Sequence, residues 1–166
     1  MKIHSRQLNE IDFKTMRELL LKEGPNEWNY ITDDSIDHQF QLINQGKALA
    51  VIAEETSIVG FAILIIKEAC PPKLSKYSVL SDIAYINDVV VASSQSGKGL
   101  GSQLLRGAIK LAGNEMCANV YIERHEENLA SAGMMRKAGF ELVETLHDPK
   151  KRTTGSRNTS VLSICT

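Results

Sequence analysis

Cysteine is scarce in this chain of 166 residues, which has only Cys70, Cys117 and Cys165, far apart in the sequence. Their number is odd, and no pair has the C-x-x-C spacing that metal and redox sites use. The sequence therefore gives no support to a thiolate metal centre. Scarce, scattered cysteines indicate a protein that works in a reducing compartment.

Long apolar runs and an excess of one charge are also absent. No run approaches the roughly 20 residues that a membrane span needs, and Met1 to Leu8 is polar and alternating rather than an apolar signal. Lys and Arg total 19 against 20 Asp and Glu, a net charge of -1. This balance offers no overall attraction for nucleic acid or an anionic membrane, so neither is expected as a partner. We expect a soluble, cytoplasmic protein.

The chain is about one domain long and has no repeats or low-complexity tracts, so we expect residues 1–166 to form a single domain. Apolar periodicity and capping residues predict helices over 9–22, 34–45, 100–113 and 128–137. Turn residues and β-branched runs predict strands over 2–7, 48–54, 58–67, 82–91, 118–123, 140–146 and 159–165. The stretch 69–81, with its two prolines, is predicted to be a mobile connection. Alternation of strand and helix after residue 82 favours parallel pairing around the first crossover.

The most informative stretch is residues 86–102, where a β-branched run ends in a loop with Gly97, Gly99 and Gly101 and a helix follows at once. Glycines let the backbone approach a ligand and take positive φ, and the first amides of a helix have no internal partners. The pattern predicts a ligand that carries phosphate. Its spacing fits neither the dinucleotide fingerprint G-x-G-x-x-G nor the Walker loop G-x-x-x-x-G-K. A tight turn with glycines for packing alone is the alternative.

Two segments resemble motifs of the GNAT family of N-acetyltransferases. The run from Ser96 to Gly101 resembles its acyl-CoA loop, written as Arg or Gln, two residues, Gly, one residue, then Gly or Ala. Ser96 departs from that pattern, Gln95 lies one residue early, and Lys98 could supply the charge instead. The run from Asn128 to Phe140 is similar to the family's closing motif, in which Asn begins a helix and Lys-x-Gly-Phe ends it.

The resemblance implies an α/β single-domain acyl-CoA N-acyltransferase fold: a mixed central sheet of about seven strands flanked by helices, with a splayed strand pair. It implies direct transfer of an acetyl group from acetyl-CoA, without a metal, to a primary amine of an unidentified small molecule or protein. A homodimer through the C-terminal strands is implied as well. The resemblance also implies that a β-bulge in the 89–91 stretch frees a main-chain N–H, which donates to the acetyl carbonyl. The residues of this stretch therefore belong to the implied cosubstrate-binding set. The full set is Val89, Val90, Val91, Ser96, Gly97, Lys98, Gly99, Leu100, Gly101, Ser102 and Asn128.

Tyr85, Asp88 and Glu123 are the candidates for the catalytic base. Tyr85 matches a strand position at which some members of the family place a carboxylate. Asp88 lies inside an apolar strand, where acids with raised pKa values are often functional, although a bond to a neighbouring backbone amide also explains it. Glu123 opens a charged run, 123–127, that is more typical of a solvated loop, and His125 within it is expected at the surface.

The acid and the acceptor site are less constrained. Met135 stands where many members of the family carry a Tyr that can protonate the departing thiolate, and spacing selects none of the nearby donors Tyr85, Tyr121 and Cys117. Trp28 and Tyr30 are predicted to line the acceptor cleft or merely to pack.

Two further segments could rim that cleft. One is Pro71-Pro72, and the other is the basic run 150–152, which could also meet an acidic acceptor or the 3′-phosphate of coenzyme A but is more typical of a solvated loop. The departures at Ser96 and Met135 leave a second function open, a non-catalytic module that binds or senses acyl-CoA. A nucleotide-binding regulatory domain is the weakest alternative, because the glycine spacing does not fit one.

Overall fold

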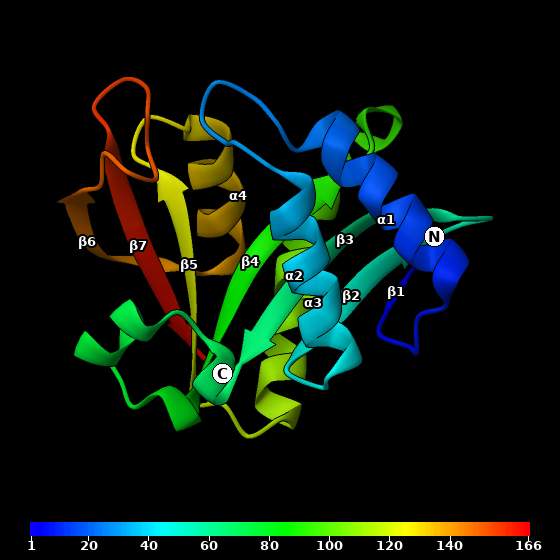
Figure 1. Cartoon of the computed structure of the whole chain (residues 1–166), viewed down its shortest axis with the longest axis horizontal. Coiled ribbons are helices and arrows are strands. Elements are labelled where there is room, and N and C mark those ends of the chain that lie inside the picture. Colours follow the sequence, from blue (N-terminus) through cyan, green and yellow to red (C-terminus); the bar gives the residue numbers. More distant parts are fainter.

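The computed structural model describes residues 1–166 as a seven-stranded sheet with helices on both faces (Figure 1). The helices are α1 (Glu10–Glu23), α2 (Asp33–Asn44), α3 (Leu100–Asn114) and α4 (Leu129–Ala138). The strands are β1 (Lys2–His4), β2 (Ala48–Glu54), β3 (Ile58–Ile66), β4 (Ile83–Val91), β5 (Asn119–His125), β6 (Glu141–His147) and β7 (Asn158–Cys165). Their order is β1-β2-β3-β4-β5-β7-β6, with β4 and β5 parallel and all other neighbours antiparallel. The predicted α/β fold with a mixed sheet is confirmed.

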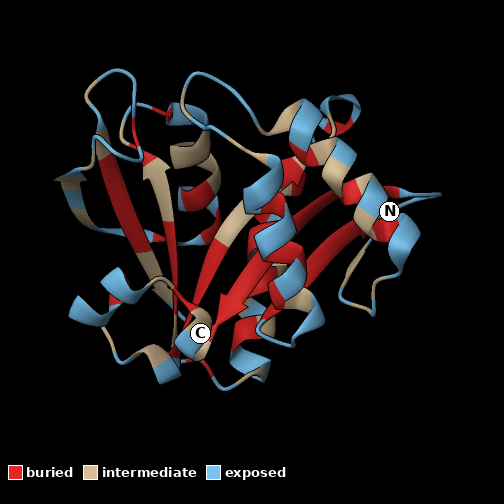
Figure 2. Cartoon of the chain, in the orientation of Figure 1, coloured by how far each residue is buried: buried red, intermediate tan, exposed pale blue.

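Two apolar cores form because the strands alternate their side chains between the faces of the sheet. One core joins α1 and α2 to the face that carries Tyr85 and Tyr121, and the other joins α3 and α4 to the face that carries Ile86 and Ile122. Figure 2 shows the buried sheet between helices whose outer faces are exposed. None of the helices combines the length and apolarity needed to cross a membrane.

The parallel strands β4 and β5 separate halfway along their length. They pair only from Ile83 opposite Asn119 to Ile86 opposite Ile122. Beyond that point β4 continues against β3, and β5 continues against β7. The splayed strand pair is therefore confirmed, and the gap that it leaves is the natural place for a ligand.

A β-bulge lies where the two strands begin to separate. Ile63 of β3 pairs with Asp88 and Leu64 pairs with Ile86, which leaves Asn87 as the extra residue. A bulge reverses the alternation of side chains after it, so Asp88 falls on the same face as Tyr85. The bulge therefore exists, but it lies at Asn87 and not within Val89–Val91, where the resemblance implied it.

The stretch 69–81, predicted to be a mobile connection, has regular turns and buried anchors. It contains the 3-10 turn Pro72–Lys76 and parts of two others, Lys67–Ala69 and Leu80–Asp82. Cys70 and Leu74 are buried in the core beneath α1 and α2. These two side chains anchor the segment. The other predicted elements begin and end within a few residues of their expected bounds.

Candidate active site

The glycine loop joins β4 to α3 with the geometry that its residues predict. After a short 3-10 turn, Ser93–Gln95, Gly97 and Gly99 take φ values of 79° and 72°, which other residues adopt only with strain. A Cβ at either position would meet no atom within 4 Å, so both glycines face open space. The unpaired amides at the start of α3, from Leu100 onward, are available for an anion.

This loop forms one wall of a cavity of about 740 Å³, here called the long groove, and α4 forms the other. Its lining is Val91, Gln95, Ser96, Gly97, Gly99, Leu100, Gly101, Ser102, Leu129, Ala130, Gly133, Met134, Arg136 and Lys137. A Cβ on Gly101 would lie 2.5 Å from Met134 Sδ, so this glycine allows α3 and α4 to pack closely.

Most of the cosubstrate-binding residues proposed from the sequence line the long groove, and Lys98 does not. Lys98 Nζ donates to Gln95 Oε1 at 3.1 Å, so its charge is directed at a neighbouring side chain of the loop. Gln95, which sequence reasoning left outside the set, lines the groove beside Ser96. Val90 is buried in the core of the opposite face, as its place in the strand alternation requires.

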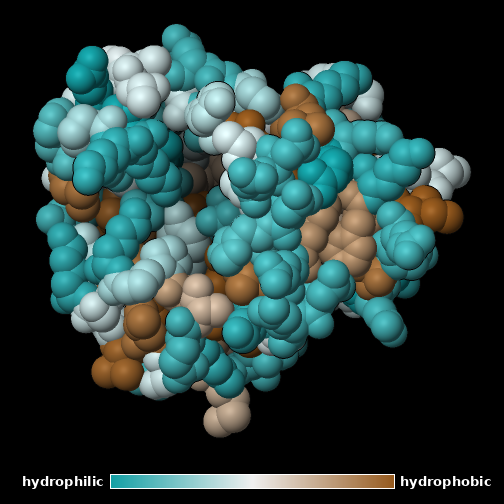
Figure 3. All heavy atoms as spheres, viewed as in Figure 1, coloured by the Kyte–Doolittle hydropathy of each residue, from teal (hydrophilic) through white to brown (hydrophobic).

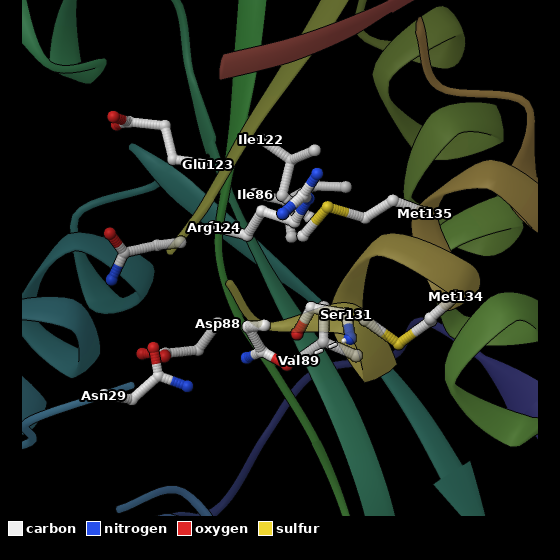
Figure 4. A pocket seen from close by; sticks show the side chains of 12 residues that line it. Asn29, Ile86, Asp88, Val89, Ile122, Glu123, Arg124, Ser131, Met134 and Met135 are labelled. Atoms are coloured by element: carbon white, nitrogen blue, oxygen red, sulfur yellow. Dashed lines mark hydrogen bonds between the residues drawn. The ribbon is translucent and has the colours of Figure 1, made fainter. Parts of the chain in front are cut away.

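The gap between β4 and β5 is a narrower cavity of about 80 Å³, here called the central gap. Its lining is Asn29, Ile86, Asn87, Asp88, Val89, Ile122, Glu123, Arg124, Asn128, Ser131, Met134 and Met135. Figure 4 shows Asp88 and Asn29 together on one side of it, with Met134 and Met135 entering from α4 on the other. Asn128 caps α4 by accepting from the Ser131 N–H at 3.2 Å. Met134 also lines the long groove, so the two cavities adjoin.

A third cavity, of about 260 Å³, opens from the central gap toward α2 and is here called the side chamber. Figure 3 shows that this face of the molecule is hollowed and mostly hydrophilic. The side chamber shares Asn29, Asn87, Asp88 and Glu123 with the central gap. Its complete lining is Asn29, Tyr30, Ile31, Ser35, Gln39, Tyr85, Asn87, Asp88, Glu123, Lys151 and Arg152.

Two buried side-chain atoms have no hydrogen-bond partner in the protein, and both belong to these cavities. They are Gln39 Oε1 in the side chamber and Arg124 Nε in the central gap. Arg124 Nη1 donates to the carbonyls of His125 and Glu126, at 3.1 and 2.6 Å, and Nε is the buried nitrogen of this side chain that has no partner. Because unsatisfied buried groups are rare, an acceptor and a donor left free here are groups that a ligand or an ordered water would complete.

Asp88 lies where the central gap and the side chamber meet. It is half-buried, and burial raises the pKa of its carboxyl to about 6, against the opposing effects of the Gln39 side chain and Lys151. No backbone amide donates a hydrogen bond to the Asp88 carboxylate, and no cation pairs with it. A bond to a neighbouring backbone amide, the alternative explanation for this residue, is therefore not observed. A carboxylate with a raised pKa at the junction of two cavities fits a proton acceptor.

Glu123 is the centre of an ion cluster rather than part of a solvated loop. Its side chain is 2% exposed and lies 2.8 Å from Lys73 Nζ and 3.6 Å from Lys151 Nζ. Tyr85 donates its hydroxyl to Glu123 Oε1 at 3.0 Å. Burial by itself would raise the pKa of the Glu123 carboxyl. The charges of Lys151 and Lys73 and the hydrogen bond from Tyr85 outweigh burial and lower that pKa below 4.5. Burial and this carboxylate raise the pKa of Tyr85 well above 10, so it is a hydrogen-bond donor here.

His125 is fully buried, which corrects its expected place at the surface. Its Nδ1 accepts from the Glu127 N–H at 3.0 Å, and its Nε2 lies 2.8 Å from the Thr154 carbonyl. The ring also packs on Trp28, with centroids 4.7 Å apart. His125 thus holds the segment after β6 against the connection between α1 and α2.

The basic run 150–152 is also not a solvated loop throughout. Arg152 is 5% exposed, and its Nε donates to Thr159 Oγ1 at 2.9 Å. Its Nη1 lies 3.5 Å from the Trp28 carbonyl, and Thr154 Oγ1 donates to the Glu27 carbonyl at 2.7 Å. Lys151 and Arg152 of this run form part of the wall of the side chamber. Pro71-Pro72 does not line it.

Three side chains were possible proton donors to the departing thiolate, and none of them is placed beside Met135. Tyr121 exchanges a hydrogen bond of 2.8 Å with Ser78 Oγ on the opposite face of the sheet, and Tyr85 is bonded to Glu123. Cys117 is buried just after α3. No cluster of three or more His, Cys, Asp or Glu side chains is placed to hold a metal ion.

The proteins that this chain resembles in sequence and in fold include several acetyltransferases. The chain is 30% identical over 79 residues to the uncharacterized N-acetyltransferase YobR of Bacillus subtilis (strain 168), a match that covers 48% of this chain and 32% of that protein. Its fold is similar to a ribosomal-protein-alanine N-acetyltransferase from Brucella melitensis, with a TM-score of 0.77, 21% identity and 100% of both chains covered. It is also similar to the aminoglycoside acetyltransferase AAC(6')-Ib in complex with coenzyme A and kanamycin, with a TM-score of 0.75, 21% identity, and 99% and 95% covered.

At such low identity, the two solved structures establish the shared fold alone. The family is established by a separate match, because the model of the acetyltransferase (GNAT) family covers residues 13–140, more than half of the chain. The protein therefore belongs to the acetyltransferase (GNAT) family.

Proposed function

We propose that this protein is an N-acetyltransferase that uses acetyl-CoA and transfers its acetyl group directly to a primary amine. The observation that carries the proposal is the row of adjoining cavities, the long groove, the central gap and the side chamber, with Asp88 where the last two meet. Membership of the GNAT family supports it, as does similarity to a structure that contains coenzyme A.

The long groove has the features that coenzyme A needs. Gly97 and Gly99 leave open space where a Cβ would stand, and the amides at the start of α3 lie at the positive end of a helix dipole. We propose that these amides hold the pyrophosphate, and that the pantetheine arm follows α4 into the central gap. The free Nε–H of Arg124 is then a donor for a carbonyl oxygen of that arm.

Bound acetyl-CoA supplies the acetyl group as a thioester. During transfer, the amine nitrogen bonds to the carbonyl carbon, the carbon–sulfur bond breaks, and the amine proton passes to the Asp88 carboxylate. The thiolate leaves and takes its proton from solvent, because Met135 cannot donate one. Glu123 stays ionised among its cations, and Tyr85 stays protonated, so neither serves as the base.

The groove assignment predicts that Gly99→Val raises the KM for acetyl-CoA about tenfold or more, because the new side chain fills space that the pyrophosphate needs. Gly46→Val is the matched control: Gly46 also has a φ of 72° and open space around it, but it lies after α2, outside the groove. Both variants carry the same backbone strain. Steady-state kinetics that give the two variants equal KM values would contradict the assignment.

The activity itself is tested by release of free thiol from acetyl-CoA in the presence of a panel of amines, beside calorimetric measurement of coenzyme A binding. We expect both binding and amine-dependent release. Tight binding with no release across the panel would instead support the non-catalytic acyl-CoA module.

We also propose that the protein works in the reducing cytoplasm and that it forms a homodimer there through its C-terminal strands. The strand β6 pairs only with β7, so its outer edge is unpaired, and Leu142 and Val143 on it are exposed. An open edge can pair with a second copy of the same strand. Analytical ultracentrifugation should show a dimer of the 18.4 kDa chain, and a monomer at all concentrations would contradict the proposal.

A further inference from the structure

Two charged side chains of the side chamber, Arg152 and Asp88, form no direct ion pair, although Glu123 and Asp148 favour the charge of Arg152 from a distance and Lys151 favours that of Asp88. Arg152, although 5% exposed, bonds only to the Thr159 hydroxyl and the Trp28 carbonyl. Asp88 forms no ion pair either. Since a buried charge without a counter-charge is costly, both are positions where a ligand's opposite charge is favoured.

The other charged side chains of the side chamber, Glu123 and Lys151, already take part in ion pairs. Glu123 lies 2.8 Å from Lys73 Nζ and 3.6 Å from Lys151 Nζ, so its carboxylate needs no further cation. Asp88 and Arg152 therefore remain as the charged side chains of the chamber that no direct ion pair engages. Lys151, on the same wall as Arg152, adds to the positive potential there.

The negative position has a second feature that indicates an amine. Gln39 lines the side chamber, and its buried Oε1 has no donor, so it is an acceptor for an N–H of the ligand. Asp88 lines both the side chamber and the central gap, whereas Arg152 and Lys151 line only the side chamber. An amine at Asp88 therefore faces the acetyl group, and the rest of the acceptor extends toward Arg152.

We infer that the acceptor is a small aminocarboxylate, whose amino group lies at Asp88 and Gln39, losing its ammonium proton to solvent before attack, and whose carboxylate lies at Arg152. This inference rests on the proposed acetyltransferase function. The chamber of about 260 Å³ is smaller than the roughly 300–1,000 Å³ typical of pockets for drug-sized ligands, which favours a molecule of amino-acid size. Diamines and polycationic sugars are disfavoured, because their second cation would lie beside Arg152 and Lys151.

The test compares α- and ω-amino acids with their carboxamides and with diamines of the same length, at saturating acetyl-CoA. We expect kcat/KM for the best aminocarboxylate to exceed that of its carboxamide at least about tenfold, as a charge-assisted pair with Arg would give. Equal or faster transfer to the carboxamide, to a diamine or to a peptide N-terminus would overturn the inference.

Arg152→Gln should remove most of this preference, because kcat/KM for the aminocarboxylate should fall much more than kcat/KM for its carboxamide. Because Arg152 is buried and this variant could unfold, Lys151→Gln is the second variant: its side chain is half-exposed, and a smaller loss of preference is expected. Circular dichroism checks that each variant folds. Full preference in every variant that folds would overturn the assignment of the carboxylate position.

Calorimetry separates this inference from the proposed function. Binding of the aminocarboxylate and of its carboxamide is measured on protein saturated with coenzyme A, where no transfer occurs. Tighter binding of the aminocarboxylate than of its carboxamide supports the inference, whether or not any acceptor is acetylated. A failure to acetylate any acceptor would contradict the proposed function and leave the binding result standing. Equal binding of the two compounds would overturn the inference whatever the activity.

Discussion

Asp88→Asn should lower kcat for acetyl transfer by about 100-fold or more, the range that loss of a general base produces. The asparagine side chain fills the same space but cannot take the proton of the attacking amine. The KM for acetyl-CoA should change much less than kcat, because Asp88 lies outside the long groove, where the pyrophosphate is proposed to bind, and asparagine keeps its volume in the central gap. Steady-state kinetics with both substrates varied separate these two effects.

The pH profile gives an independent signature of Asp88. Its pKa is raised to about 6, so below that pH the carboxyl is protonated and cannot act as a base, and kcat/KM should rise with pH through this range. The acceptor amine has its own ionisation at higher pH, which is the same for both proteins. In Asp88→Asn only the rise near pH 6 should disappear. Survival of that rise in the variant would show that another group is the base.

Stability distinguishes loss of chemistry from loss of fold in this variant. A carboxyl whose folded pKa lies above its unfolded value of 3.8 favours folding only while protonated, and this contribution is lost as pH rises through about 6. At neutral pH the ionised Asp88 therefore opposes folding, and Asp88→Asn should melt no lower than the original protein. Asp82→Asn, at an exposed residue just before β4, is the control for both activity and melting.

The fold and the glycine loop could be predicted from the sequence because their signals are local. Apolar periodicity marks each helix and strand, and Gly97 and Gly99 mark two positions whose positive φ requires glycine. These features depend on neighbouring residues along the chain. The long groove follows from them once the loop is placed at the start of α3.

The side chamber could be predicted only in part, because it depends on contacts between distant segments. Glu123 meets Lys73 and Lys151 from two other parts of the chain, so a charged run that is typical of a surface loop becomes an ion cluster. The sequence does hold one unused signal: in a strand of period two, Tyr121, Glu123 and His125 share one face. Extending β5 by two residues beyond its predicted end would have placed His125 beside the core.

The bulge at Asn87 is the feature that sequence reasoning could not locate. Without it, strand alternation would direct Asp88 toward the face of Ile86 and α4. With it, Asp88 joins Tyr85 on the face that α2 covers, next to Gln39. One extra residue in β4 therefore determines which face of the sheet carries the proposed base.

Glu123→Gln should lower the free energy of unfolding by about 2 kcal/mol, within the range measured for hydrogen bonds to charged groups. The glutamine cannot pair with Lys73 and Lys151, and Tyr85 loses an ionised acceptor. The two lysines are half-exposed and regain water, so the loss should stay below the 3–5 kcal/mol typical of a broken, fully buried ion pair. In a chain of this size, 2 kcal/mol corresponds to a fall in Tm of about 4–8 °C.

The chain contains a matched control at Glu144. Its carboxylate also pairs with a lysine and accepts from a tyrosine, Lys76 and Tyr77, but its side chain is 39% exposed. Because exposed pairs contribute little, Glu144→Gln should cost less than about 1 kcal/mol. Equal falls in Tm for Glu123→Gln and Glu144→Gln would show that burial of the Glu123 cluster does not strengthen it.

The pH dependence of the Glu123 effect follows from the sign of its pKa shift. A carboxyl whose folded pKa lies below 4.5 stabilises the fold above that pH, and the stabilisation disappears as pH falls through the folded pKa. The difference in Tm between the original protein and Glu123→Gln should therefore be full at neutral pH and shrink well below pH 4.5. A difference that does not change with pH would mean that the glutamine disturbs packing, and that the charge of Glu123 contributes nothing to the stability of the fold.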